Sequence, residues 1–324
     1  MKIYAAPMEG VTGYVYRNAH RKYFRGIDKY FTPFLTPKQG KGWTSREKND
    51  VAPEHNRTLV LVPQILTNRA EDFVRMAEKL ADCGYGEVNL NLGCPSGTVV
   101  AKGKGCGFLA DRDQLLHFFT YVFDHMREGI RVSVKTRLGK DSPEEIVPLM
   151  EIYNQFPLSE VIIHARILRD FYKKPVNREA FRKGFLLCRH PVCYNGDIFA
   201  AEDFRQFQDE FPTVERVMLG RGLIANPQLA ELLTEGGSPD KDRWKAFHDE
   251  VCLGYEDVMS GERNVLFKMK ELWDYMLPMF EDSGKLGKKI KKAVRLADYK
   301  EIVETLFQER ELKPFEAGKG QGQE

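Results

Sequence analysis

Eight short apolar segments recur along the first two thirds of this chain, and most of them precede a longer stretch with helical spacing. Each is rich in Val, Ile, Leu or aromatic residues, a composition typical of buried strands. The segments span residues 3–8, 29–34, 59–65, 87–93, 131–137, 160–166, 192–197 and 214–221. Because strands that alternate with helices in this number close into a parallel barrel, we predict an α/β protein with a (β/α)8 TIM barrel.

The stretches between the predicted strands carry helix signals. Residues 70–83 and 113–126 each space their apolar side chains on one helical face. Ser142 precedes Pro143 and two glutamates, which is the pattern of a helix N-cap followed by an acidic first turn. Residues 36–57 are polar and predict a long surface loop rather than a helix.

No strand is predicted beyond residue 236, where glycine and proline break the alternating pattern. Helices are expected there over residues 242–260, 263–280, 285–296 and 298–310. The sequence therefore predicts three parts: a barrel domain over 1–236, a small helical domain over 237–315 and a disordered tail over 316–324.

The composition is that of an ordinary globular protein, with 324 residues of which 42% are apolar and 30% charged. There is no run of 18 apolar residues, and the N-terminus runs into the first predicted strand without the apolar segment of a signal peptide. We expect a cytoplasmic protein with no membrane contact.

Six cysteines are scattered along the chain without a CxxC pair or histidine-rich spacing. This usage argues against a disulfide framework and against a zinc site, so no metal is expected. Cys188 and Cys193 lie five residues apart, around His190 and Pro191, in an apolar neighbourhood, and are interpreted as core residues.

One segment stands out against a net charge of only +2: residues 285–295 hold six basic side chains and no acid. Leu286, Ile290, Val294 and Ala297 keep helical spacing on the opposite side. The segment is either a solvated helix face or a surface that contacts a phosphate backbone. Its basic residues are Lys285, Lys288, Lys289, Lys291, Lys292 and Arg295.

Polar residues gather where the predicted strands end, and in a barrel the carboxyl ends of the strands carry the chemistry. Seven of the eight ends should therefore converge on one mouth. These residues are Met8 and Glu9; Gln64; Asn89, Asn91 and Cys94; Lys135 and Arg137; His164 and Arg166; Asn195, Gly196 and Asp197; and Gly220, Arg221 and Gly222.

Cys94 follows a strand that ends on Gly93 and precedes Pro95, so a single thiol is presented at the strand tip. A small buried side chain is the usual fate of such a cysteine. The neighbouring amides of Asn89 and Asn91, on one strand face, favour a reactive thiol instead.

The last two strands end in glycine turns that lead into helices, at residues 195–197 and 220–222. Backbone N–H groups and the Arg221 guanidinium there predict a site for a cofactor phosphate. A flat cofactor across the mouth would meet Gln64, while Lys135 and His164 suit the place where negative charge develops on its ring. A structural role for Lys135 is the alternative.

Taken together, these collinear motifs resemble the dihydrouridine synthase family of flavoproteins. The resemblance covers the helical C-terminal region as well. The segments that carry it are residues 6–10, 63–64, 89–96, 135–137, 164–166, 194–197 and 219–222.

The resemblance implies a (β/α)8 enzyme that uses FMN, reduced by NADPH, to convert a flipped-out uridine of tRNA to 5,6-dihydrouridine; ribosomal RNA is the other possible substrate. It implies that Cys94 donates the proton to C5, and a monomer is expected. It assigns the cofactor to Pro7, Met8, Glu9, Gln64, Lys135, His164, Asn195, Gly196, Asp197, Gly220 and Arg221. It implies that Asn91 and Arg137 lie near the uracil. Because a base that leaves its stack needs basic surface to hold the RNA backbone, the further RNA candidates are Arg166, Lys102, Lys104, Lys288, Lys289, Lys291, Lys292 and Arg295.

The chain departs from the family pattern in two places. Residues 167–175 lack the glutamine and the aromatic-glycine pair expected after His164 and Arg166, and Cys106 stands where a small residue is expected. Two other functions remain open. A dihydroorotate dehydrogenase-like enzyme would carry a Ser-Cys-Pro-Asn type of motif, which is absent, and a non-catalytic RNA-binding protein would not need Cys94 or Lys135.

Overall fold

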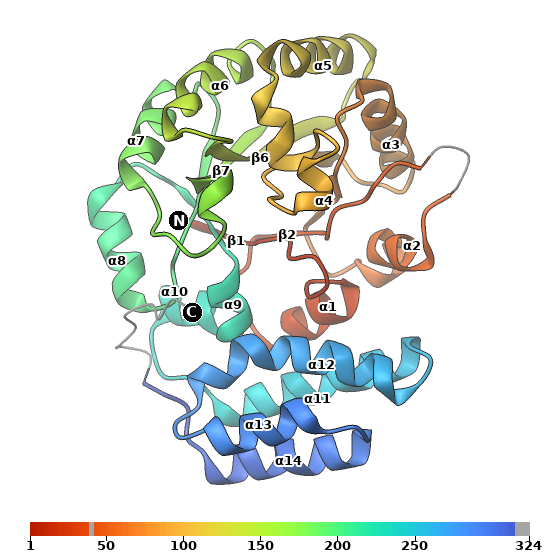
Figure 1. Ribbon diagram of the computed structural model, residues 1–324, viewed down its shortest axis with the longest axis vertical. Helices are drawn as coiled ribbons and strands as arrows, with labels where there is room; N and C mark the ends of the chain where they lie inside the picture. The colour runs from red at the N-terminus through yellow and green to blue at the C-terminus, as the bar shows by residue number, and fades with distance from the viewer. Residues whose placement is uncertain (39–41, 315–324) are drawn as a thin grey trace.

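The computed structural model describes residues 1–38 and 42–314 and confirms the predicted barrel with a helical C-terminal region (Figure 1). Within these residues, nine parallel strands form one sheet in the order β3-β2-β1-β9-β8-β7-β6-β5-β4. The strands are β1 (Lys2–Ala5), β2 (Lys29–Phe31), β3 (Leu61–Val62), β4 (Gln64–Ile65), β5 (Glu87–Leu92), β6 (Arg131–Gly139), β7 (Glu160–Ile167), β8 (Val192–Asn195) and β9 (Arg216–Leu219).

The two ends of this sheet, β3 and β4, are halves of the third predicted strand, separated by Pro63. Proline has no backbone N–H to donate, so the ladder breaks at that residue. The carbonyl of Pro63 still accepts from the N–H of Asn89 at 2.9 Å, and a bridge between Leu35 and Ile65 joins the neighbouring segments. The ring of strands is therefore closed, and the described residues hold nine strands instead of the predicted eight because Pro63 divides the third one.

Helices cover the outside of the barrel, as Figure 1 shows for α3, α5, α6, α7 and α8. The α-helices of the barrel are α1 (Tyr14–Tyr23), α2 (Ser45–Val51), α3 (Ala70–Asp82), α4 (Gly97–Val100), α5 (Arg112–His125), α6 (Ile146–Tyr153), α7 (Arg178–Leu187), α8 (Ala201–Glu210), α9 (Arg221–Ala225) and α10 (Leu229–Glu235). Short 3-10 turns are η1 (Pro53–His55), η2 (Gly105–Ala110), η3 (Pro143–Glu145), η4 (Leu168–Asp170) and η5 (Leu277–Met279).

The segment predicted as a long loop contains helix α2, which corrects that expectation. Thr44 and Glu47 form a capping box: the Thr44 side chain accepts from the Glu47 N–H at 3.2 Å, and the Glu47 carboxylate accepts from the Thr44 N–H at 2.8 Å. The helix is held against α1, because Asp50 accepts from the Tyr14 N–H at 2.7 Å. The Thr-x-x-Glu spacing was present in the sequence and outweighs the polar composition.

The C-terminal region consists of α11 (Lys241–Val258), α12 (Glu262–Met276), α13 (Gly284–Lys292) and α14 (Leu296–Glu309). Its apolar core is shared with the barrel. Val15 and Tyr16 of α1 and Ile224 of α9 belong to the same buried cluster as Trp244 and Trp273. The chain passes from the barrel to the helical region between α10 and α11, which is where the division at residue 236 was predicted. The two parts on either side of that position share one apolar core.

Helix α13 ends earlier than predicted. Ala293 follows it in an extended conformation (φ −56°, ψ 132°) and is itself buried, so the helical spacing stops at Lys292. Val294 is consequently 80% exposed and Ala297 is exposed, whereas both were expected on the inward face. Leu286 and Ile290 face inward as predicted. The predicted tail, 316–324, lies outside the described residues.

Within the described ranges, no helix combines the length and apolar character needed to cross a membrane.

Candidate active site

A cavity of about 310 Å³ lies where the barrel strands end at their carboxyl side. It gathers every residue that was predicted to bind a cofactor, together with three of those assigned to catalysis or substrate. Those residues are Pro7, Met8, Glu9, Gln64, Lys135, His164, Asn195, Gly196, Asp197, Gly220 and Arg221, with Asn91, Cys94 and Arg166. Arg137, Lys102, Lys104 and the basic residues of 285–295 do not line it.

A chain of hydrogen-bonded side-chain amides runs from strand to strand, and two of its members, Gln64 and Asn91, line the cavity. Asn89 Nδ2 donates to Ser133 Oγ at 3.0 Å, and Gln64 Nε2 donates to Asn89 Oδ1 at 2.8 Å. Asn91 Nδ2 then donates to Gln64 Oε1 at 2.7 Å. Each amide thereby orients the next, and Gln64 keeps one N–H and one acceptor lone pair for a ligand.

The same chain of amides ends at Cys94. Asn91 Oδ1 accepts from the backbone N–H of Cys94 at 2.9 Å and from that of Gly93 at 3.1 Å. Both bonds hold the turn that presents the thiol. Burial is the largest influence on the pKa of Cys94 and raises it, outweighing the nearby cations Arg137 and Lys135. Cys94 is therefore a protonated thiol at neutral pH.

A glycine-rich segment packs over Cys94 from the side of η2. Gly105 has φ +56°, and a Cβ on it would lie 2.8 Å from the Cys94 carbonyl oxygen. A Cβ on Gly107 would lie 2.8 Å from the Val100 carbonyl oxygen. Only residues without a side chain allow this close approach. Cys106 is fully buried, and its thiol contacts the Gly139 carbonyl at 3.6 Å, so it fills a core position.

The structure gives Arg137 a different set of contacts from those expected. The side chain is fully buried, and its Nε donates to the Gly93 carbonyl at 2.9 Å. Nη1 donates to the Ile167 carbonyl at 2.8 Å, and both terminal nitrogens donate to the Phe171 carbonyl at 3.3 Å. In this arrangement Arg137 ties the Cys94 turn to the segment after β7, and contact with a uracil stays a prediction.

Lys135 and His164 come from neighbouring strands, β6 and β7. Burial, followed by the charge of Arg137, lowers the pKa of Lys135 to about 8. Burial also lowers the pKa of His164 well below its usual value, and four surrounding cations act in the same direction. His164 is therefore neutral. Its Nε2 lies 3.3 Å from Arg166 Nη1 and accepts from it, which leaves Nδ1 as the protonated nitrogen.

Two arginines share the carboxylate of Asp197. Arg166, with only 2% of its side chain exposed, pairs with it through both terminal nitrogens. Arg221 Nη2 lies 2.7 Å from Asp197 Oδ1. Arg166 Nε also donates to the Lys174 carbonyl at 2.7 Å. Asp197 therefore holds two guanidinium groups beside the glycine turns that follow β8 and β9.

The segment that departs from the family pattern brings an aromatic ring to the cavity. Tyr172 stacks on His164 with ring centroids 5.9 Å apart, and the Arg221 guanidinium lies 5.2 Å from the Tyr172 ring centroid. The preceding residue, Phe171, has φ +46°, a conformation rare for a residue with a side chain. Tyr172 was not predicted as a site residue, although the two aromatic residues at 171 and 172 in a polar segment were a visible signal.

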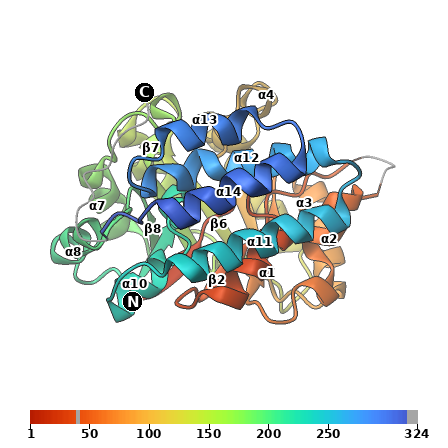
Figure 2. The same ribbon diagram turned by 90° about the horizontal axis from the view of Figure 1, so that it is seen from below.

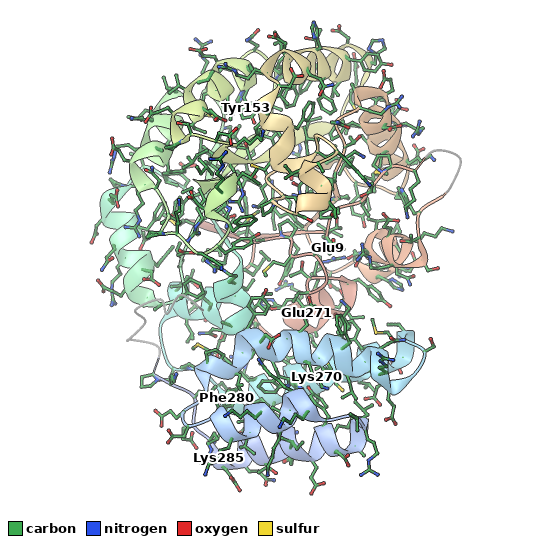
Figure 3. The ribbon with its side chains drawn as sticks, viewed as in Figure 1. Glu9, Tyr153, Lys270, Glu271, Phe280 and Lys285 are labelled. Carbon is green, nitrogen blue, oxygen red and sulfur yellow. The ribbon has the colours of Figure 1, made fainter. Side chains whose placement is uncertain are left out.

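The helical region completes the cavity through Tyr275 of α12. Burial raises the pKa of Tyr275, with Glu271 and Tyr172 contributing in the same direction. Helix α12 is fixed to the loop after β1, because Lys268 Nζ donates to the Gly10 carbonyl at 2.6 Å. Figure 3 shows Glu9 and Glu271 on the two sides of this junction. No sequence pattern indicated that a residue after position 236 would reach the site.

The lining of the cavity fits an anionic, flat cofactor. Its cations Lys135, Arg166 and Arg221 outnumber its carboxylates, Glu9 and Asp197. Glu9 is moreover paired with Arg46 outside the cavity. An excess of positive charge beside backbone turns suits a phosphate, and a partly buried lysine suits a ring that gains negative charge.

The cations predicted to hold RNA lie outside the cavity. Lys102 is exposed and Lys104 is half-buried in the turn after α4. Figure 2 shows α13 on the same side of the molecule as α4, with α11 on the opposite side. Both basic segments therefore face the side on which the barrel opens, and their contact with RNA remains a prediction.

Comparisons with known proteins agree with this geometry. The family model described as dihydrouridine synthase (Dus) matches residues 4–311. The tRNA-dihydrouridine(16) synthase of Pseudomonas putida is 31% identical over 236 residues, which cover 71% of this chain and 72% of that protein. The enzyme of that name from Neisseria meningitidis is 25% identical over 316 residues and covers 92% of each chain.

Two solved structures share the barrel. The old yellow enzyme homologue from Zymomonas mobilis has a TM-score of 0.54 at 11% identity and covers 80% of this chain and 95% of that chain. Morphinone reductase has a TM-score of 0.52 at 13% identity and covers 76% of this chain and 88% of that chain. At these identities the likeness concerns the fold alone.

Proposed function

The chain belongs to the dihydrouridine synthase family, and from this premise we propose that it reduces a uridine of tRNA to 5,6-dihydrouridine with a bound flavin. The relatives in Pseudomonas putida and Neisseria meningitidis are named for position 16 of tRNA. Uridine 16 is therefore the position we propose for this chain. The observation that carries the proposal is a protonated cysteine thiol on the same cavity as a lysine of lowered pKa and a pair of arginines.

We propose FMN as the flavin. Arg221 and the turns at 195–197 and 220–222 would hold its phosphate, and Gln64 would contact the polar edge of its ring. When bound, FMN supplies the hydride that adds to C6 of the uracil. Lys135 would stabilise negative charge on the ring, and neutral His164 would donate a hydrogen bond there without adding charge.

Cys94 is the proposed proton donor. Saturation of the C5=C6 bond requires a proton at C5 in addition to the hydride, and a thiol with a raised pKa keeps its proton at neutral pH. The thiolate left by the transfer regains its proton from solvent. NADPH is the proposed reductant, so the overall reaction consumes one NADPH and one proton for each uridine reduced.

The uridine must leave the base stack to reach the cavity, and surface cations must hold the backbone while it does so. We propose Lys102, Lys104 and the lysines of α13 for this task, because they face the side on which the barrel opens. We also propose that the protein is a cytoplasmic monomer. The basic surface suits one copy of the chain that binds one RNA, so the RNA is the large binding partner.

The experiment that tests the proposal separates the proton step from flavin reduction. The Cys94→Ala variant should purify with its flavin and should oxidise NADPH at the wild-type rate, but it should form little dihydrouridine in a tRNA transcript. The matched control is Cys252→Ala, since Cys252 is buried in the helical region and does not line the cavity. Wild-type yields of dihydrouridine from Cys94→Ala would refute the assignment of the proton donor.

A dihydroorotate dehydrogenase-like activity can be excluded in the same assay. In an enzyme of that kind, free dihydroorotate would reduce the flavin and free orotate would reoxidise the reduced flavin. For this chain we expect neither change, and we expect reoxidation of the reduced flavin by RNA. A protein that purifies without flavin and does not oxidise NADPH would instead favour the non-catalytic alternative.

A further inference from the structure

A second hollow lies outside the cavity, beside the first half of α12. Phe267 is 69% exposed, and Val294, in the turn between α13 and α14, is 80% exposed. Both line a hollow of about 420 Å³ together with Leu266 and Ala293. Two large apolar side chains left in water beside one hollow indicate a surface that binds something.

The rim of this hollow is cationic. Arg263 and Lys270 line it, and none of the described residues that line it is acidic. Lys270 Nζ donates to the Ala293 carbonyl at 2.5 Å, which fixes the turn against α12. Lys268 Nζ lies 5.9 Å from the centre of the Phe267 ring. An aromatic ring among cations suits an occupant that has a flat face and negative charge.

The hollow adjoins the basic segment that was predicted to contact RNA. Leu296, just after Arg295, donates its N–H to Glu262 at the start of α12 at 3.0 Å. Arg295 pairs with Asp298 and Lys291 pairs with Asp274. Across the described part of the chain, Arg263, Lys288 and Lys292 form no ion pair, so their charges are available to phosphates.

Helix α12 links this hollow to the active site. Phe267 and Tyr275 lie eight residues apart on it, which is about 12 Å along the helix axis at the usual rise per residue. Tyr275 lines the catalytic cavity and Phe267 lines the cationic hollow. One RNA loop could therefore place one base in the cavity and another, a short distance along the strand, on Phe267.

We propose that the hollow formed by Phe267 and Val294 is a stacking site for a second, unpaired nucleobase of the RNA substrate. This inference rests on the proposed function, since it takes RNA as the partner. The ring of Phe267 would stack on the base, while Arg263 and the lysines of α13 would meet the flanking phosphates. The site requires a base that is free of pairing, because a base within a duplex offers no open face.

Two variants at position 267 test the proposal. Phe267→Ala should bind an unmodified tRNA transcript about fivefold or more weakly at fixed salt, which is the loss expected from one base stacked on an aromatic ring. Its Kd should keep the wild-type dependence on salt, because no phosphate contact is removed. Leu253→Ala is the matched control: Leu253 is 56% exposed on α11, which Figure 2 shows on the opposite side.

Phe267→Trp reports stacking directly. Its fluorescence should be quenched by the tRNA transcript but not by a fully paired RNA duplex of similar length, and Leu253→Trp should respond to neither. Equal quenching by duplex and tRNA, or an unchanged affinity of Phe267→Ala, would overturn the inference. So would a wild-type dimer that becomes a monomer in Phe267→Ala, because the hollow would then be a protein interface.

The proposed function is tested separately by the formation of dihydrouridine. If Phe267→Ala binds normally while the wild type still reduces tRNA, only the stacking site fails. If the wild type neither binds nor reduces tRNA, the proposed function itself fails.

Discussion

The side-chain oxygen of Asn91 lies 2.9 Å from the backbone nitrogen of Cys94 and accepts its hydrogen bond. The other end of the same amide donates to Gln64 at 2.7 Å. Asn91 thus connects the residue proposed to deliver the proton with a residue proposed to contact the flavin. The position of the thiol relative to the cofactor depends on one amide that is 8% exposed.

Asn91→Ala should separate cofactor binding from proton transfer. The substitution leaves the N–H groups of Gly93 and Cys94 without their acceptor, a loss of about 1–3 kcal/mol for a buried partner. We expect flavin to remain bound and dihydrouridine formation to fall by about 10-fold or more, measured by single-turnover kinetics. Asn154→Ala, at the end of α6, is the control and should keep wild-type turnover.

Gly105→Ala should displace the Cys94 turn. The backbone has φ +56° there, and the new Cβ would lie 2.8 Å from the Cys94 carbonyl oxygen. A cost of about 1–3 kcal/mol is expected from the left-handed conformation and the clash. Thermal unfolding should show a lower midpoint, together with reduced product formation.

The control for this substitution is Gly97→Ala, at the start of α4, where no heavy atom of the described residues lies within 4 Å of an added Cβ. Equal effects of the two substitutions would show that the close approach at residue 105 is unimportant.

The pH dependence of flavin reduction should report Lys135. Its pKa is lowered to about 8, chiefly by burial. The positive charge is therefore present below this pH and is lost as the pH rises through it. We expect the second-order rate of flavin reduction by NADPH to decline above pH 8.

Lys135→Arg retains the charge to much higher pH, because a guanidinium stays protonated. It should therefore abolish the decline even if its absolute rate is lower. A decline of unchanged midpoint in this variant would assign the titration to another group.

Charge reversal on α13 should weaken RNA binding in a salt-dependent way. Lys288 and Lys292 are exposed on the helix that faces the same side as α4. The slope of log affinity against log salt is negative. Replacing both lysines with Glu should make it shallower by roughly 0.7–0.9 for each phosphate that is no longer neutralised. The paired control reverses Lys2 and Lys79, which are exposed on β1 and α3. If both double variants behave alike, α13 is an ordinary solvated surface.

Much of the site could be predicted from the sequence because strand ends are local features. A strand's apolar residues mark where it lies, and the polar residues at or just after its carboxyl end lie near the barrel mouth. Gln64, Lys135, His164 and Arg221 were therefore assigned to one site although they are far apart in the chain, and all four line one cavity. Helix α2 was missed for a different reason: its capping box, Thr44 with Glu47, was overlooked in a polar segment.

The contacts of Arg137 and Tyr275 could be decided only by the tertiary structure. Arg137 has the strand-end position of a ligand-binding residue, yet the hydrogen bonds of its guanidinium go to the carbonyl groups of Gly93, Ile167 and Phe171. Which acceptors surround a guanidinium depends on how distant loops pack, and the apolar periodicity of the sequence does not predict that packing.

Tyr275 reaches the cavity because α12 is anchored to Gly10 and because the helical region shares its core with α1. The sequence alone determined the barrel and the ring of polar residues at its mouth, since alternation along each strand sets which side chains point where. Tertiary packing decided which of those residues remain open to a ligand, and which part of the helical region closes the site.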